Sequence, residues 1–166
     1  MSITETSSRI AHYTSSQIYR LLGSAAVQKT YIEEKKYESQ LGVSCNEDAG
    51  SRASNWGTMM QYYVAEKYLP KGFKWYDKTE VHPTIKSWSG TADIISKIAA
   101  GDVKCFYRTK FAQVANCIME CEEIRKLSHF DRPERDYAPL KKNHPEIYWQ
   151  ITSNAAILNK SKGLLI

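Results

Sequence analysis

The chain has 166 residues, of which 42% are hydrophobic and 25% charged, values typical of one ordinary globular domain. This composition excludes a disordered chain, a collagen-like repeat and a coiled coil. The net charge of +5 is a mild basic excess that suits a polyanionic partner. No apolar run approaches the roughly 20 residues that span a bilayer, and the polar N-terminus lacks the apolar core of a secretory signal. We therefore expect a cytoplasmic protein with no membrane partner.

The N-terminal half of the sequence predicts three helices. The first ten residues are polar and are expected to fray. The sequence TSSQ at 14–17 has the form of a capping box, with its threonine at the N-cap, and predicts a helix that ends near Gly23. A second helix is expected over 25–40. Small polar residues at 44–55 predict a loop, and a third helix is expected to begin near Trp56.

The C-terminal half predicts strands as well as helices. In order, these are a strand over 73–85, a hairpin with strands 89–98 and 102–107 that turns around 99–101, a helix over 110–127, a charged connection over 128–145, a helix over 146–158 and a strand over 163–166. Helices combined with a few short strands indicate an α/β fold with a small mixed β-sheet flanked by helices.

The predicted hairpin carries charged side chains within segments that otherwise look buried. Asp93 lies in its first strand, and Asp102 and Lys104 lie in its second. Side chains alternate along a strand, so Asp102 and Lys104 share a face, and a two-residue turn at 99–100 or 100–101 places Asp93 on that face too. A three-residue loop would break this parity. Two carboxylates on one face suit Mg²⁺ or Mn²⁺. From spacing alone, a surface ion pair between Asp102 and Lys104 is the commoner explanation of such a pattern.

Four segments, taken in order, resemble one family of nucleases. Asp93 preceded by alanine, followed by Asp102-Val103-Lys104, is similar to the PD-(D/E)xK signature, with Asp in the place of the commoner Glu. The segment WGTMMQ at 56–61 resembles the helix motif of the YqaJ-like phage recombination exonucleases, and YWQI at 148–151 resembles their glutamine helix. Arg9 with residues 14–16 resembles their 5′-phosphate segment. The resemblance covers residues 9–166.

This resemblance implies a restriction-endonuclease-like core that forms a single nuclease domain over residues 1–166. It implies a Mg²⁺-dependent DNA exonuclease that degrades double-stranded DNA from 5′ to 3′ in phage-type recombination. Its partners would be DNA, further copies of the chain in a ring, and a single-strand annealing protein, inside a bacterial or phage-infected cell. The alternatives are a DNA-binding module with weakened chemistry and an endonuclease or nickase of the same superfamily.

The resemblance also assigns roles to individual residues. Asp93, Asp102 and the carbonyl of Val103 would bind the metal, and Lys104 would be the catalytic lysine. The residues assigned to DNA or phosphate are Arg9, Ser15, Ser16, Tyr148 and Gln150. Helix capping is an equally good explanation of Ser15 and Ser16.

Two features depart from the family pattern. Gln61 stands at the helix position that usually carries Glu or His, and we expect it to reach the catalytic site as a weaker, neutral metal ligand. The sequence also ends at Ile166, earlier than such enzymes usually end, which predicts a truncated or unusually short member.

Overall fold

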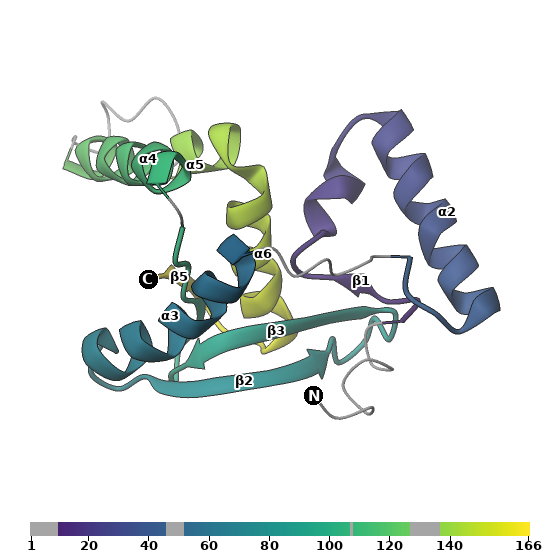
Figure 1. Ribbon diagram of the computed structural model, residues 1–166, viewed down its shortest axis with the longest axis horizontal. Coiled ribbons are helices and arrows are strands. Elements are labelled where there is room, and N and C mark those ends of the chain that lie inside the picture. Colours follow the sequence, from purple (N-terminus) through teal and green to yellow (C-terminus); the bar gives the residue numbers. More distant parts are fainter. Residues whose placement is uncertain (1–9, 46–51, 107, 127–136) are drawn as a thin grey trace.

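A computed structural model describes residues 10–45, 52–106, 108–126 and 137–166, and within it five strands form one mixed sheet (Figure 1). The strands are β1 Tyr13–Thr14, β2 Lys74–Val81, β3 Trp88–Ile95, β4 Ala99–Asp102 and β5 Lys162–Leu165. Strand β3 is central, because it pairs antiparallel with β2 and β4 and parallel with β1. Strand β5 adds to β4 in parallel. The sheet is therefore mixed, as predicted.

The helices flank this sheet (Figure 1). They are the short 3-10 helix η1 Ile18–Leu22 and the α-helices α2 Ala25–Leu41, α3 Arg52–Tyr68, α4 Arg108–Lys126, α5 Ala138–Asn143 and α6 Pro145–Ile157. Helix α6 is the central one, because it packs on β3, β4 and β5 and also against η1 and α5. Helices α4 and α5 lie together beside α6, whereas α2 lies at the opposite end of the molecule, near β1 (Figure 1).

An apolar cluster joins α4, α5 and α6. Its buried members are Val114, Cys117, Cys121, Leu140, Ile147 and Ile151. The cluster holds α6 in place, and α6 in turn carries polar side chains to the sheet.

No helix in the described ranges is long and apolar enough to cross a membrane.

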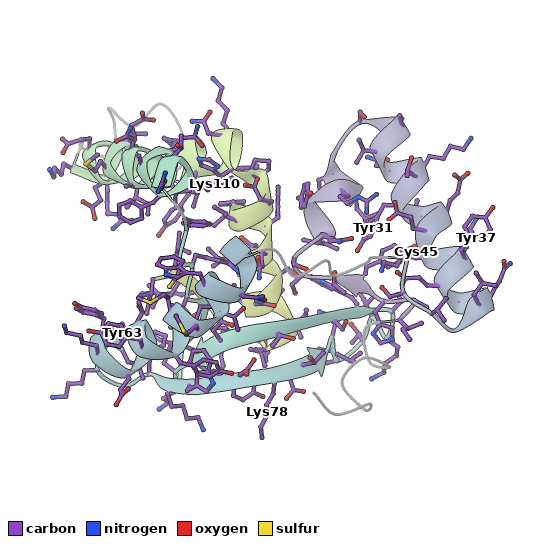
Figure 2. All side chains as sticks on the ribbon, viewed as in Figure 1. Tyr31, Tyr37, Cys45, Tyr63, Lys78 and Lys110 are labelled. Carbon is purple, nitrogen blue, oxygen red and sulfur yellow. The ribbon has the colours of Figure 1, made fainter. Side chains whose placement is uncertain are left out.

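Helix α2 is fixed to the start of the chain by buried polar contacts. Tyr31 is fully buried, and its hydroxyl oxygen accepts the Thr14 N–H at 3.2 Å (Figure 2). The Arg20 guanidinium lies 4.5 Å from the centre of the Tyr31 ring and donates to both carboxylate oxygens of Glu34 at 2.6 and 2.7 Å. Such a bidentate pair fixes orientation more firmly than a single contact, so η1 and α2 form one unit.

The N-terminal capping prediction is wrong. Thr14 is the last residue of β1, the N-cap of η1 is Gln17, and no side chain caps this helix. The backbone on either side of Thr14 pairs with the sheet, because the Tyr13 N–H donates to Ser87 O at 2.7 Å and the Ser15 N–H to Ser89 O at 2.9 Å. These long-range hydrogen bonds override the local capping signal, which can only act where the backbone groups are otherwise free.

The hairpin turn is also placed differently from its prediction. The Ser96 N–H donates to Ala99 O at 2.8 Å, so the turn centres on residues 97–98 and not on 99–101. Within this segment, Gly101 allows close packing of β4 against β5, since a Cβ on Gly101 would lie 2.6 Å from Leu164 O. Strand β4 ends at Asp102, so the predicted strand over 102–107 is wrong for residues 103–106, and residue 107 lies outside the described residues.

Two helix predictions also need correction. Helix α3 begins at Arg52, inside the segment predicted to be a loop. Helix α5 lies inside the predicted connection over 128–145, of which 128–136 fall outside the described residues. Prolines stand in the first turns of α5 and α6, where their missing N–H costs nothing, so here proline starts helices and does not interrupt them.

At Gly90, strand β3 lies very close to the segments that cover it. A Cβ atom at Gly90 would overlap Ser15 Oγ and Asn154 Oδ1 and would lie 2.9 Å from Ile157 Cδ1. All three neighbours belong to buried residues. We expect Gly90→Ala to lower the free energy of unfolding by at least about 1–3 kcal/mol, because an overpacked core must shift to admit the added atom. Chemical denaturation measures this change.

Gly57→Ala in α3 is the matched control. Its added Cβ would meet only Cys105 O, at 3.4 Å, and alanine is the better helix former by roughly 0.5–1 kcal/mol. This control is expected to leave stability unchanged or raise it. Equal effects of the two substitutions would contradict the tight packing around Gly90.

Candidate active site

The two predicted acidic residues meet where β3 and β4 pair. The pairing sets Ile94 opposite Gly101 and Ile95 opposite Ala100, so the next step of the same register sets Asp93 opposite Asp102. The observed strand pairing is displaced from the expected pairing by an even number of residues. Such a displacement leaves each side chain on the same side of the sheet. The two carboxyls therefore lie on the same face, as the sequence argument required.

Asp102 is held by two amide side chains of α6. Only 1% of Asp102 is exposed. Its Oδ1 and Oδ2 accept hydrogen bonds from Asn154 Nδ2 at 3.2 and 3.0 Å, and Oδ1 also accepts one from Gln150 Nε2 at 3.3 Å. Burial raises the pKa of Asp102 to about 6, with Lys104 opposing and Asp93 adding to the shift. A carboxyl so buried and so oriented is suited to bind a cation.

Asp93 and Gln61 each hold one backbone group of Val103. The Val103 N–H donates to Asp93 Oδ2 at 2.8 Å, and Gln61 Nε2 donates to the Val103 carbonyl at 2.6 Å. Burial raises the pKa of Asp93, while the Val103 N–H and the charge of Lys104 lower it. Helix α3 thus reaches the site through Gln61, which contacts the carbonyl that the family resemblance assigns to the metal.

Lys104 follows Val103 directly, and its backbone is held by Ile166, the residue after β5. Its backbone N–H donates to Ile166 O at 2.8 Å, and the Ile166 N–H donates to Asp102 O at 3.0 Å. The Lys104 side chain is half-buried, and its positive charge acts on the pKa of both Asp93 and Asp102. The site thus contains two carboxylates and one ammonium group.

The residues that the family resemblance assigns to phosphate do not come together as the two carboxylates do. Ser15 is 2% exposed, and its hydroxyl lies 2.9 Å from Ser153 Oγ and 3.3 Å from Ser89 O, inside the packing between β3 and α6. Ser16 is exposed, with its hydroxyl 3.4 Å from Thr14 Oγ1. Arg9 lies outside the described residues.

Tyr148 and Gln150 both lie on α6 but have different surroundings. Gln150 reaches Asp102, whereas Tyr148 packs against the apolar cluster of α4, α5 and α6 and contacts the edge of the Trp149 ring, with centroids 5.0 Å apart. The ammonium of Lys141 lies 5.8 Å from the Tyr148 ring centre. Only Gln150 of this pair contacts the carboxylates.

Asn154 is the site residue that the sequence argument missed. It is buried, and its amide nitrogen bridges both Asp102 oxygens and Thr91 O, the last at 3.0 Å. The sequence carries one signal for Asn154. It stands four positions after Gln150, and residues at that spacing share a helix face, so Asn154 could have been placed beside Gln150.

The donor atoms at this site fit a hard divalent cation. Asp93, Asp102 and the Val103 carbonyl offer only oxygen, the ligand type preferred by Mg²⁺ and Mn²⁺. Within the described ranges no group of three or more His, Cys, Asp or Glu could hold a metal ion. A metal here would therefore rest on two carboxylates and complete its shell with water and phosphate, an arrangement usual for Mg²⁺.

Gln61→Glu tests whether α3 contributes to a metal site. It replaces an amide donor by a carboxylate facing the Val103 carbonyl, so the metal-free variant is expected to lose about 1–3 kcal/mol of stability. Mn²⁺ should restore more stability to this variant than to the original protein, because hard cations gain affinity with ligand charge. Thermal unfolding during a Mn²⁺ titration measures both effects.

Gln61→Met is the control, since it removes the donor without adding charge. It is expected to lose stability and to gain nothing extra from Mn²⁺. Coincident Mn²⁺ titration curves for the two variants would mean that residue 61 does not act on a metal.

The arrangement of sheet and helices is that of an exonuclease-like α/β fold, which confirms the fold class expected from the sequence. The chain superposes on the crystal structure of an alkaline exonuclease, LHK-Exo, from Laribacter hongkongensis with a TM-score of 0.67 and 17% identity, covering 96% of this chain and 70% of that one. The complex of LHK-Exo with dAMP gives a TM-score of 0.64 and 18% identity, covering 95% and 69%. No protein-family model matches the sequence, and no curated protein matches it.

Proposed function

We propose that the chain is a metal-dependent DNA exonuclease that hydrolyses phosphodiester bonds. The observation that carries this proposal is the meeting of Asp93 and Asp102 beside Lys104, on a fold shared with an alkaline exonuclease. The motif resemblance adds the finer proposal that one nuclease domain degrades duplex DNA from 5′ to 3′ in phage-type recombination, in the cytoplasm. It also adds a ring of copies and an annealing protein as partners.

Each residue of the site has a distinct role in this proposal. Asp93, Asp102 and the Val103 carbonyl would hold Mg²⁺ or Mn²⁺. When bound, such an ion supplies Lewis acidity and lowers the pKa of water. Asn154 and Gln150 keep the Asp102 carboxylate in one orientation, which avoids the cost of ordering it during the reaction.

Lys104 acts on the substrate in this scheme. Its ammonium would face the phosphate and stabilise the negative charge that builds up there as the bond breaks. Asp93 also fixes the backbone through the Val103 N–H, so the residue that precedes Lys104 cannot rotate freely. Positioning and charge are thus supplied by three consecutive residues and their partners.

Incubation with linear and circular duplex DNA, with Mg²⁺ or with EDTA, tests the proposal. Exonuclease action predicts Mg²⁺-dependent loss of linear DNA while closed circles stay intact. Labels at the 5′ or the 3′ end then report the polarity. Cutting of circles would indicate an endonuclease or a nickase instead.

A second candidate, a DNA-binding module with weakened chemistry, is favoured by one contact. Gln61 Nε2 donates a hydrogen bond to the Val103 carbonyl at 2.6 Å. This carbonyl oxygen is the one that would otherwise bind the metal. DNA binding without cleavage under any Mg²⁺ or Mn²⁺ concentration would support this candidate over the exonuclease.

A further inference from the structure

Three lysines from separate parts of the chain line one hollow at the turn end of the β3–β4 hairpin. Lys74 begins β2, Lys97 lies in the turn and Lys160 follows α6. The hollow has a volume of about 420 Å³. Its other lining residues, none of them acidic, are Gly72, Phe73, Ile95 and Ser96. We call this feature the lysine hollow.

The backbone fixes the three lysines relative to one another. Lys74 pairs with Ile95 across β2 and β3, next to the turn that carries Lys97. Lys160 Nζ donates to the Lys97 carbonyl at 3.3 Å, and the Ser161 N–H donates to Ile98 O at 3.1 Å. In Figure 1 the start of β2 and the end of β3 lie together, below the end of α3. The hollow is therefore part of the fold and does not depend on one mobile side chain.

The charges of the lysine hollow are not balanced within the part of the chain that the structure describes. None of its three lysines forms an ion pair there. Like charges gathered in one place repel each other, and an anion relieves that repulsion. The hollow therefore favours a ligand with concentrated negative charge.

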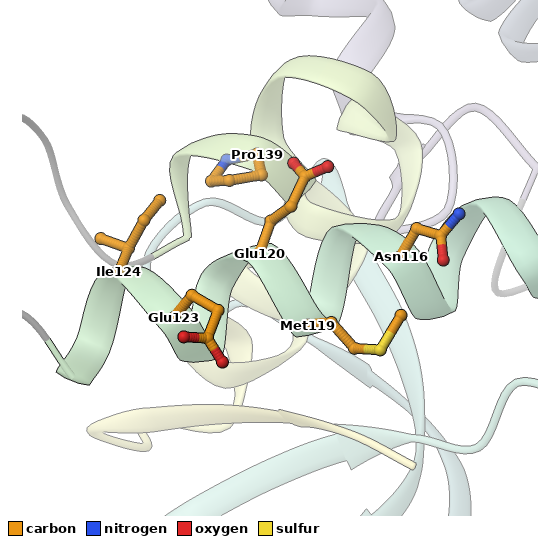
Figure 3. A pocket seen from close by; sticks show the side chains of 6 residues that line it. All are labelled: Asn116, Met119, Glu120, Glu123, Ile124 and Pro139. Atoms are coloured by element: carbon orange, nitrogen blue, oxygen red, sulfur yellow. The ribbon is translucent and has the colours of Figure 1, made fainter.

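A larger hollow on the same molecule has the opposite character. It has a volume of about 560 Å³, and the side chains of Glu120 and Glu123 on α4 line it together with Met119 and Pro139 (Figure 3). Its carboxylates would repel a phosphate. The two hollows thus differ in the sign of their charge, and only the lysine hollow suits a polyanion.

The lysine hollow also lies close to the proposed catalytic carboxylates. Its lining residue Ile95 is two positions from Asp93 on β3, a separation of about 6.6 Å along a strand. Successive phosphates of one DNA strand advance by about 3.4 Å along the helix axis. A strand cleaved at Asp93 and Asp102 therefore has further phosphates within reach of the hollow.

We propose that the lysine hollow binds a backbone phosphate of the DNA strand that is cleaved at Asp93 and Asp102. This proposal rests on the proposed nuclease function and adds to it a contact outside the reacting bond. Such a contact carries no sequence information but holds the strand in position. The contact would be made by lysines, whose ammonium groups act as point charges and bind phosphate without a fixed geometry.

DNA affinity as a function of salt tests the proposal. Binding of a fluorescent duplex in EDTA, followed by anisotropy, is compared for the original protein and for Lys97→Gln and Lys160→Gln. Each substitution is expected to weaken binding about 3- to 10-fold at low salt and to reduce the slope of log K against log salt by about 1. Lys97→Arg, which keeps the charge, should bind like the original protein.

Lys78→Gln is the matched control, because Lys78 lies on β2 as Lys74 does but outside the hollow (Figure 2). It should leave both affinity and slope nearly unchanged. Equal weakening in Lys78→Gln and Lys97→Gln would overturn the hollow as a site, since it would indicate a general effect of surface charge.

The failure of this proposal is distinguishable from failure of the proposed function. If the original protein binds and cleaves DNA and both Lys97→Gln and Lys160→Gln behave as it does, the proposed phosphate site in the lysine hollow is wrong. The proposed nuclease function is then unaffected. If the original protein neither binds nor cleaves DNA, the proposed nuclease function is wrong, and so is the proposed phosphate site.

Discussion

Asp93→Asn and Asp102→Asn are each expected to lower DNA cleavage by on the order of 10³-fold or more, because each removes one of the two carboxylates proposed to bind the metal. Both variants should also lose Mn²⁺ binding, measured by calorimetry or electron paramagnetic resonance, while their circular dichroism stays unchanged. The substitutions keep side-chain size, so loss of binding is not a consequence of lost packing.

Glu123→Gln is the control for these two variants. Glu123 is an exposed carboxylate on α4 paired with Lys126, and it does not contact the site. It should cleave DNA and bind Mn²⁺ as the original protein does. Cleavage retained by both aspartate variants would show that the hairpin carboxylates are not the catalytic centre.

Lys104→Ala is expected to reduce kcat by on the order of 10²–10³-fold with little change in DNA affinity, because its charge is most needed when the phosphate becomes more negative. Single-turnover cleavage at saturating DNA gives the rate, and anisotropy in EDTA gives the affinity. Lys104→Arg keeps the charge and should recover part of the rate.

Lys78→Ala, an exposed lysine on β2, controls for the loss of one positive charge. It is expected to change neither rate nor affinity appreciably. Weakened binding with an unchanged kcat in Lys104→Ala would make Lys104 a phosphate anchor and not a catalytic residue.

The helices were largely predictable because their signals are local. Helix α2 ends at Leu41 and is capped by Gly42, whose positive φ of 68° suits glycine. The Gly42 N–H donates to Glu38 O at 2.9 Å. The mistakes arose where distant packing decides the outcome. Residues 99–101 look like a turn by composition, but they form β4, and Gly101 allows its close pairing with β5.

The candidate site was predictable in part for a related reason. The alternation of side chains along the strands predicts Asp93 and Asp102 on one face even with the turn misplaced, because the observed pairing is shifted by an even number of residues. The burial of Ser15 was not predictable, since it depends on β1 pairing with β3, 74 positions away along the chain. Asn154 was missed because no motif marks it.

The central claim is that Asp93 and Asp102 together bind a divalent metal ion, and anomalous scattering from a crystal soaked in Mn²⁺ tests it most directly. We predict a single strong anomalous peak bound by carboxylate oxygens of both residues, with ligand distances near the 2.0–2.1 Å typical of octahedral Mg²⁺ sites, or slightly longer for Mn²⁺. A second crystal, of the Asp102→Asn variant, should lack this peak. A peak elsewhere, or none between Asp93 and Asp102 in the original protein, would contradict the metal site and the mechanism built on it.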